Sequence, residues 1–306
     1  MKIISGLLNF LAGLSAVVIL PFLLQLTPVL AQTTAPNSGA GLGTSYNWSG
    51  YVATGSNFSS ITGTWVIPLV AVSPSLTADA AWIGIGGVTS GDLIQVGTQE
   101  LTGGTSTTYQ AWYEMLPGFS QPISITINPG DSVTGTLTQT QAGQWSITFK
   151  DNSNGQTFQT SAPYNSSLSS AEWIEEMPSQ GSGRFIPLDN FGSIQFTNVA
   201  SVNNGQTLTA AQANASQMTM INSSGQTLAT PSALAADGAS FTVTRTSAAP
   251  SYVTSGFSQR GRGGWSRVGV GVSGFTGFGS IPNTSPHFRG FYRMRYRFIT
   301  RFSFER

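Results

Sequence analysis

Short alternating segments separated by turn residues run through most of this chain and restrict it to an all-β fold. Apolar or β-branched residues alternate with polar ones at 60–67, 123–127, 132–137 and 145–149. Turn sequences such as Asn128-Pro-Gly-Asp131 and Asn203-Asn-Gly205 separate runs of this kind. A period of two is typical of strands with one buried face, and Asn-Gly pairs favour tight hairpins. Helical periodicity nowhere exceeds about two turns, apart from a weak signal at 210–215, so we predict one β-sandwich or β-barrel over 46–246.

The first 31 residues have the pattern of a secretory signal peptide. Lys2 precedes a long apolar run, and Ala31 ends it with a small-residue cleavage site. A run of about twenty apolar residues can also span a bilayer, so an uncleaved membrane anchor is the alternative. Because Pro21 and Pro28 interrupt the run, we favour cleavage, which predicts a secreted, extracellular protein without membrane contact. Residues 32–45 are rich in Gly, Thr, Ser and Pro and are expected to form a linker or a short pro-segment.

Charge is distributed unevenly along the chain. From 41 to 246, eleven acidic residues are opposed by only three basic ones, Lys150, Arg184 and Arg245. Residues 247–306 instead hold nine arginines and one acid. Their Arg-Gly repeats resemble nucleic-acid-binding segments, but we favour a disordered basic tail and expect no nucleic acid partner. The domain itself loses its net charge as pH falls, which suits work in acid.

The residue types missing from the chain exclude several kinds of active site. The chain has no Cys, and its one His, His287, lies in the basic tail. Ser-His-Asp and Cys-His catalytic arrangements and His/Cys zinc sites are therefore excluded from the domain. We expect no metal and no cofactor. Without Cys the domain has to be stable without disulfides, and about two hundred residues can bury a sizeable core unaided. An enzyme of this composition has to work with carboxylates and amides.

Three glutamates crowd one strand-like run, Ala171-Glu-Trp-Ile-Glu-Glu-Met177. On a strand, Glu172 and Glu176 would share one face, while Glu175 would point to the other. At least one carboxylate is therefore expected on each face of this strand. The alternative interpretation is a solvated edge strand that uses its charge against aggregation.

Two further segments place polar groups on strand patterns. In residues 109–115, Gln110, Trp112 and Glu114 share one predicted face, as in clefts that hold sugars or peptides. The alternative is an exposed sheet face with aromatic cross-strand pairs. Gln95 lies in an apolar strand-like run, where a buried amide must find hydrogen-bond partners. Its alternative role is that of a satisfied core amide.

In order along the chain, these segments resemble the glutamic peptidase family, the eqolisins. The resemblance covers about 46–246 and rests on motifs that are weak singly and specific together: Asn47-Trp-Ser-Gly50, Trp82-Ile-Gly-Ile85, Ile94-Gln-Val-Gly97, Tyr109-Gln-Ala-Trp-Tyr-Glu114, Gly130-Asp-Ser132, Ala171-Glu-Trp-Ile-Glu-Glu176 and Phe191-Gly-Ser-Ile-Gln-Phe-Thr-Asn198. It implies an antiparallel two-sheet β-sandwich of the concanavalin or lectin type and an acid-acting endopeptidase. We accordingly expect a monomer that acts on polypeptides.

The resemblance also implies roles for individual residues. The family's catalytic glutamine falls on Gln95 and its catalytic glutamate on Glu176. Trp82, Trp112 and Glu114 match residues that line the family's active-site cleft. These five residues are the predicted site.

The chain departs from the family at two positions near this site. Gly86 and Gln110 stand where the fungal enzymes have aspartates, and the family's disulfides are absent. Losing two carboxylates changes the groups that would tune Glu176, so the resemblance leaves the pH optimum open.

The implied chemistry is peptide hydrolysis by an activated water. Glu176 would take a proton from water and return it to the leaving nitrogen, while the Gln95 amide orients the water and stabilises the oxyanion. Because glutamine cannot titrate, we expect a working pH near the ordinary glutamate pKa of about 4.

Two other functions fit the same segments. A glycoside hydrolase would pair Glu172 or Glu114 with Glu176 across a cleft and would need no Gln95. A non-catalytic, carbohydrate-binding sandwich would use Trp82 and Trp112 as stacking platforms.

Overall fold

The computed structural model describes residues 43–180 and 184–250, and all regular secondary structure in these two ranges is β-strand. The strands are β1 (Gly43–Ser45), β2 (Trp48–Thr54), β3 (Phe58–Val66), β4 (Thr77–Gly86), β5 (Leu93–Gly103), β6 (Ser106–Met115), β7 (Gln121–Pro122), β8 (Ser132–Gln141), β9 (Gln144–Asp151), β10 (Thr157–Pro163), β11 (Ser170–Glu176), β12 (Ser179–Gln180), β13 (Arg184–Phe185), β14 (Ser193–Asn203), β15 (Gln206–Thr209), β16 (Ser216–Ile221), β17 (Thr227–Pro231) and β18 (Phe241–Arg245). The expected signal peptide, most of the expected linker and the tail from residue 251 lie outside the described residues.

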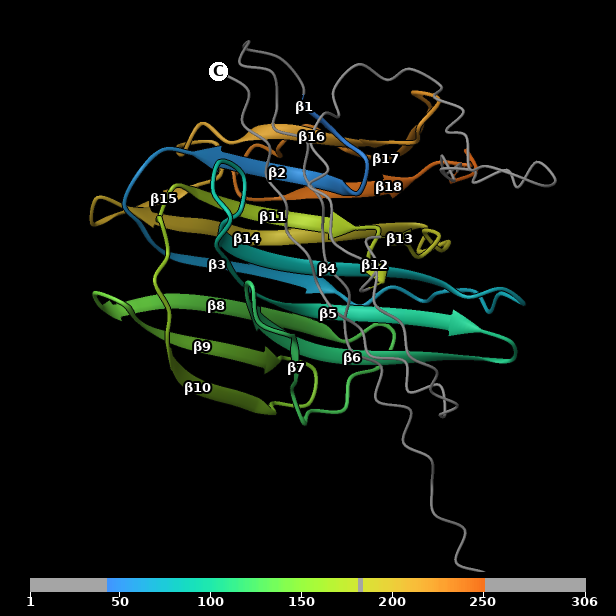
Figure 1. The fold of residues 1–306 in the computed structure, drawn as a ribbon, viewed down its shortest axis with the longest axis horizontal. Coiled ribbons are helices and arrows are strands. Elements are labelled where there is room, and N and C mark those ends of the chain that lie inside the picture. The colour runs from blue at the N-terminus through green and yellow to red at the C-terminus, as the bar shows by residue number, and fades with distance from the viewer. Residues whose placement is uncertain (1–42, 181–183, 251–306) are drawn as a thin grey trace, which may run out of the picture.

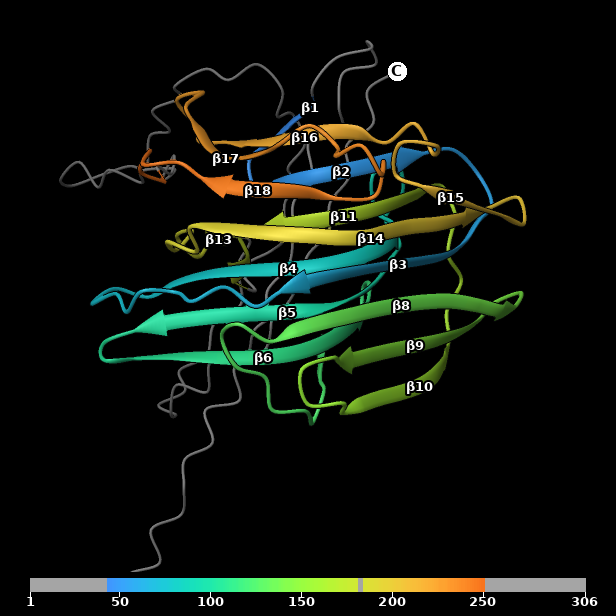
Figure 2. The ribbon, with the colours of Figure 1, turned by 180° about the vertical axis from the view of Figure 1, so that it is seen from behind.

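The strands are arranged in two stacked layers that belong to one hydrogen-bonded sheet. Strands β16, β2, β11, β4, β5, β6 and β7 form the layer nearer the viewer in Figure 1, and β17, β18, β14, β3, β8, β9 and β10 form the layer nearer the viewer in Figure 2. Neighbouring strands are antiparallel apart from the parallel pair β1–β16. The predicted all-β, antiparallel fold is confirmed, with the layers joined through β16 and β17 rather than forming two separate sheets.

Aromatic side chains fill the space between the layers. Trp65, Trp173 and Phe196 are fully buried there, and the Trp65 and Phe196 rings lie 6.0 Å apart. Trp173 on β11 donates its indole N–H to the backbone oxygen of Thr62 on β3 at 2.8 Å. Trp65 on β3 donates to Thr98 Oγ1 on β5 at 3.0 Å. Because these bonds satisfy indole groups in a buried position, they hold the layers in register without any disulfide.

Most expected turns and strands form where the sequence places them. Asn204 and Gly205, with φ of 49° and 78°, make the tight turn between β14 and β15 that an Asn-Gly pair favours. The strand predicted at 123–127 is wrong: this segment is buried at Ile123 and Ile127 but forms no regular ladder. Pro122 precedes this segment and Pro129 follows it, and neither has a backbone N–H to donate. A regular ladder is therefore interrupted at both ends of the segment. Residues 210–214 form turns instead of a helix.

The N-terminal end of the described chain adds a short strand to the domain. Gly43–Ser45, which fall in the segment expected to be a linker, pair with Met218–Met220 on β16. Within the described part of the chain, no helix is long and apolar enough to cross a membrane.

Candidate active site

Five adjacent strands of one layer, β2, β11, β4, β5 and β6, bring the predicted site residues together (Figure 1). Gln95 on β5 lies opposite Glu114 on β6, and Gly97, two residues further along β5, lies opposite both Trp82 and Trp112. Directly opposite residues share a face of a sheet, as do residues two apart on one strand. Gln95, Glu114, Trp82 and Trp112 therefore share one face.

Glu176 belongs to the same face. On β11, Ile174 lies opposite Trp82, and Glu176 is two residues further along, opposite Ala80. The intervening residues point the other way, because Trp173 reaches β3 in the second layer. The site face is thus the face of this layer that is turned away from the core.

Gln95 is fixed by a hydrogen bond to Glu114. Its Nε2 donates to Glu114 Oε2 at 2.8 Å, and both side chains are buried. Nε2 carries two hydrogens, so this bond uses one and leaves a second N–H. Burial raises the pKa of Glu114 well above its ordinary value, and the bonds from Gln95 and from the Ser120 backbone only partly oppose this. The predicted cleft-lining glutamate is therefore the group that orients the amide.

The Glu176 carboxyl is held at both oxygens. Trp82 Nε1 donates to Oε2 at 2.8 Å, and Asn47 Nδ2 donates to Oε1 at 3.5 Å. The Trp82 ring in turn meets the Trp48 ring edge to face, with centroids 4.9 Å apart. Trp82, predicted to line the cleft, is thus a hydrogen-bond donor to the predicted catalytic carboxyl.

Burial changes the acidity of Glu176. Burial is the main reason that the pKa of this carboxyl is raised well above 4.5. The hydrogen bond from Trp82 lowers the pKa, the nearby Glu114 carboxyl raises it, and the hydrogen bond from Asn47 has the smallest effect and lowers it. The sequence-based expectation of a pKa of about 4 took an unshifted glutamate. The structure differs from that expectation because the side chain is only 1% exposed.

Gly86 and Gln110, the two positions near the site where the chain departs from the family, have different surroundings. Gly86 has φ of +88°, and a Cβ there would lie 2.7 Å from Asp92 Oδ2 and 2.6 Å from the Asp92 carbonyl oxygen. An aspartate at Gly86 would therefore clash, and the Asp92 carboxylate lies beside this position instead. Gln110 donates to the backbone oxygens of Ala111 and Ile123.

The three glutamates of β11 are divided between its faces as the alternation predicts. Glu172 shares the site face with Glu176, with Ile174 between them, and Glu175 points into the core. The alternative of a solvated edge strand is wrong, because β11 pairs with both β2 and β4 and all seven of its residues are buried.

The core side of these strands holds a cluster of four carboxyl side chains, which sequence reasoning missed. Asp79 on β4 lies close enough to the carboxyls of Glu100 on β5, Glu175 on β11 and Asp189 in the segment before β14 for these groups to affect one another's pKa values. We call these four residues the core carboxyl cluster. Carboxyls buried close together disfavour one another's ionised forms. Among the described residues, no cluster of His, Cys, Asp or Glu side chains is arranged to hold a metal ion.

Burial raises the pKa values in the core carboxyl cluster. The pKa values of Asp79, Glu100 and Glu175 lie well above their ordinary range, first because of burial and then because of one another's charges. Burial also raises the pKa of Asp189, to about 7, while the charge of Arg245 opposes the rise. Asp189 and Arg245 line the same surface hollow, so Asp189 is the member nearest to solvent.

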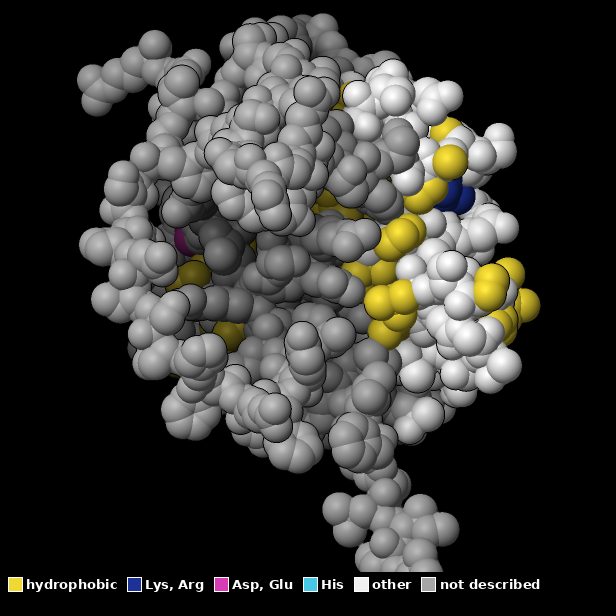
Figure 3. Space-filling model, turned by 45° about the vertical axis from the view of Figure 1, so that its right-hand side comes forward, with side chains coloured by type: hydrophobic (Ala, Val, Ile, Leu, Met, Phe, Trp, Pro, Cys, Tyr) yellow, Lys and Arg dark blue, Asp and Glu magenta, His cyan; other side chains and the backbone are white. Residues whose placement is uncertain are grey.

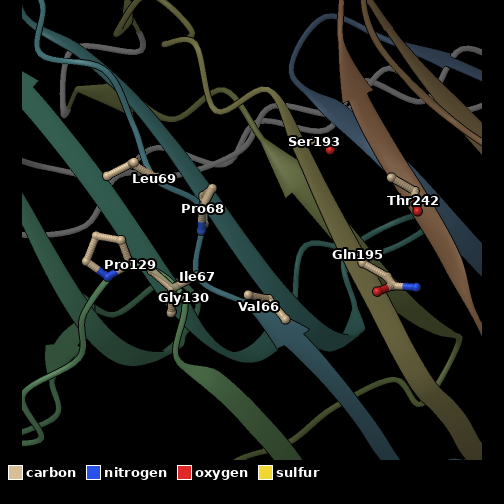
Figure 4. Close-up of a pocket in the computed structure, with 9 residues that line it drawn as sticks. All are labelled: Val66, Ile67, Pro68, Leu69, Pro129, Gly130, Ser193, Gln195 and Thr242. Carbon is tan, nitrogen blue, oxygen red and sulfur yellow. The ribbon is translucent and has the colours of Figure 1, made fainter. Parts of the chain in front are cut away.

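A separate hollow lies on the other layer. It has a volume of about 720 Å³ and is lined by residues of β3, β14 and β18 and of the loop before β8, including Val66, Leu69, Pro129 and Gln195 (Figure 4). It contains none of the predicted site residues. Asn47 and Trp48, by contrast, belong to the site although neither was proposed for it; their signal was the Asn47-Trp-Ser-Gly50 motif.

The fold is that of glutamic peptidases of known structure. Residues 46–245 match the peptidase A4 family, and the chain belongs to this family. It is therefore a hydrolase of peptide bonds, and its substrates are polypeptides.

The chain is similar in sequence and in structure to individual glutamic peptidases. The chain is 33% identical over 188 residues to scytalidopepsin B of Scytalidium lignicola, covering 58% of this chain and 71% of that protein. It is 29% identical over 189 residues to aspergillopepsin-2 of Aspergillus niger, covering 54% and 67%. The crystal structure of scytalido-glutamic peptidase with a transition state analog inhibitor is similar with a TM-score of 0.58 and 27% identity, covering 66% of this chain and 98% of that one. These similarities favour the peptidase prediction over the glycosidase and sugar-binding alternatives.

Proposed function

We propose that Gln95 and Glu176 form a catalytic dyad that hydrolyses internal peptide bonds with an activated water and without a covalent intermediate. The observation that carries this proposal is their placement: both lie on one sheet face, and each is held by a second site residue. Glu114 fixes the Gln95 amide, and Trp82 fixes the Glu176 carboxyl. A preorganised donor and a fixed base are what water attack on an amide requires.

The proposed steps use one carboxyl twice. Ionised Glu176 takes a proton from water as the water oxygen bonds to the scissile carbonyl carbon. The carbonyl oxygen becomes an oxyanion and accepts the second N–H of Gln95 Nε2. When the tetrahedral intermediate collapses, the C–N bond breaks and Glu176 returns its proton to the leaving nitrogen. The products are a carboxylic acid and an amine, and Glu176 is ionised again.

The working pH follows from the surroundings of Glu176. As the base it must be ionised, and burial raises its pKa well above 4.5. Activity should therefore rise with pH through a value above that of an ordinary glutamate. The enzyme should be most active in mildly acid solution rather than strongly acid solution.

Secretion is part of the same proposal. The leader-like sequence at 1–31 supports export, and the absence of Cys makes the domain independent of the redox state of its compartment. Mildly acid extracellular fluid would then be its place of work.

Site variants test the dyad on a denatured protein such as casein. Glu176→Gln should lower kcat by about 10²–10⁴-fold, because the general base is lost. Gln95→Ala should lower it by about 10²–10³-fold, because an oxyanion donor is lost. The measurement is the initial rate of new amino groups at pH 4 to 7, with circular dichroism to show that each variant is folded.

Glu172→Gln is the matched control, since Glu172 lies on the same face and strand. It should keep most of the wild-type rate. A folded Glu176→Gln variant with wild-type activity would overturn the dyad. A Glu172→Gln variant as inactive as Glu176→Gln would instead indicate a pair of carboxyls.

A further inference from the structure

The turn that leads into β2 contacts the proposed catalytic carboxyl. Asn47 is fully buried, and its Nδ2 donates to Glu176 Oε1 at 3.5 Å. The main-chain oxygen of Asn47 accepts the N–H of Met177, the residue after Glu176, at 2.8 Å. Side chain and backbone of one residue thus hold the end of β11 from the neighbouring strand.

Ser45 determines which way the Asn47 amide points. Its hydroxyl donates to Asn47 Oδ1 at 3.1 Å and accepts the backbone N–H groups of Asn47 and Trp48 at 3.2 and 3.1 Å. An amide whose oxygen is bound to a hydroxyl presents its NH₂ group on the other side. The Asn47 amide is therefore oriented with its donor toward Glu176.

We propose that Asn47 is a positioning residue for the reaction, and that Ser45 behind it fixes the amide that orients Glu176 toward the attacking water. This inference rests on the proposed function, because it assigns Asn47 a role through Glu176. Trp82 on β4 holds Oε2 and Asn47 in the turn before β2 holds Oε1, so two donors from different segments set the carboxyl plane. Neither donor titrates in acid, so both act at every working pH.

The charged surroundings of Glu176 make this donor chemically important. Glu114 on β6 is the carboxyl of the site face that raises the Glu176 pKa, and on β11 itself Glu172 shares this face while Glu175 points into the core. The neighbouring positions of β2 and β4 present Trp48 and Ala80, which carry no charge. Since no cation contacts Glu176 among the described residues, hydrogen bonds from neutral donors are what favour its ionised form.

Removing the Asn47 donor should shift the acid limb of the pH profile, that is, the pH range over which activity falls as Glu176 becomes protonated. A hydrogen bond to a charged group is lost in Asn47→Ala, so the Glu176 pKa should rise and kcat/KM below that pKa should fall about tenfold, a shift of about one pH unit. Ser45→Ala should shift the limb in the same direction by less, because the amide keeps its hydrogens but loses its fixed orientation. KM should stay within about twofold of wild type.

The measurement is the pH profile of kcat/KM from pH 3 to 7, together with ¹³C NMR titration of the Glu176 carboxyl. Asn222→Ala is the matched control: Asn222 is a buried asparagine at the β16–β17 turn, and its amide bonds to Gln226 and Ala249 rather than to Glu176. It should lower the melting temperature without moving the acid limb. If Asn47→Ala does not fold, Ser45→Ala decides alone.

An unshifted acid limb and an unshifted NMR titration in the folded variants would overturn the inference. A shift equal to that of Asn222→Ala would do the same, since it would mark a merely structural effect. The proposed function fails separately, if folded Glu176→Gln keeps its activity. With Glu176→Gln inactive and the limb unmoved in the Asn47 and Ser45 variants, only the role of Asn47 is rejected.

Discussion

Three glutamates within five residues of β11 have three different surroundings. Glu176 is held by two donors, Glu175 belongs to the core carboxyl cluster, and Glu172 lies on the site face beyond Ile174. The alternation of a strand predicts which face each carboxyl takes, and the structure agrees. It does not predict their partners, because Trp82 and Asn47 come from strands distant in the sequence.

The acidity of Glu176 shows the same limit of sequence reasoning. The family resemblance pointed to this residue, and the register places it with Gln95 on one face. Its raised pKa depends mainly on burial of the side chain, and burial is a property of the folded structure. A pattern in one strand carries no measure of that packing.

At the scale of strands, hydrophobic alternation located most elements but not their neighbours. A solvated edge strand was the alternative interpretation of the three glutamates of β11, and the structure excludes it because the strand is central and fully buried. The segment 123–127 has a strand pattern but lacks a regular partner. Both cases have one cause: the pattern reports which face is buried, while pairing is decided by segments far away in the chain.

Close contact between β4 and β5 depends on Gly97. A Cβ at this position would lie 2.5 Å from the Ala81 carbonyl oxygen and 2.5 Å from Trp82 Cβ. Gly97→Ala should therefore push the two strands apart and lower the free energy of unfolding by about 1–3 kcal/mol. Urea unfolding followed by tryptophan fluorescence measures this.

Gly103→Ala, at the far end of β5, is the control for that substitution. Its added Cβ would meet Leu76 Cδ1 at 3.5 Å, an ordinary contact. This variant should be close to wild type in stability. Equal stability of the Gly97 and Gly103 variants would show that the strand contact is not tight.

At the scale of the whole molecule, the acidic groups of the domain are mainly inside it. Eight of the eleven acidic residues between 41 and 246 are buried. On the described surface in Figure 3, uncharged polar and apolar side chains predominate. The count of charges predicted an acidic domain suited to acid, but it could not show that the carboxyls meet in pairs and clusters.

The core carboxyl cluster should make the fold less stable as pH rises. In the native state burial raises the pKa values of its carboxyls, that of Asp189 from 3.8 to about 7. A carboxyl with a raised native pKa contributes its full stability below its ordinary pKa and loses it as pH rises through the native value. The melting temperature should thus fall from pH 4 to above 7.

Asp79→Asn should reduce this pH dependence, because the amide supplies a permanent donor and removes one charge from the centre of the cluster. Arg245 near Asp189 and Tyr109 beside the cluster do not become negative in this range. The charge of Glu176 also acts on Glu175, in the wild type and in the variant alike. The fully exposed Asp237 provides the control, since Asp237→Asn should leave the slope unchanged. A melting temperature that stays constant or rises from pH 4 to 7 in the wild type would refute the role of the cluster.

The position of a tetrahedral inhibitor tests the central claim most directly, because it shows which groups meet the reacting atoms. A crystal structure with a phosphinic peptide would supply it. We expect one phosphinyl oxygen at about 2.7–3.1 Å from Gln95 Nε2 and the other against the Glu176 carboxyl, with Glu172 out of contact. A phosphinyl group bound to Glu172, or bound away from either Gln95 or Glu176, would contradict the account.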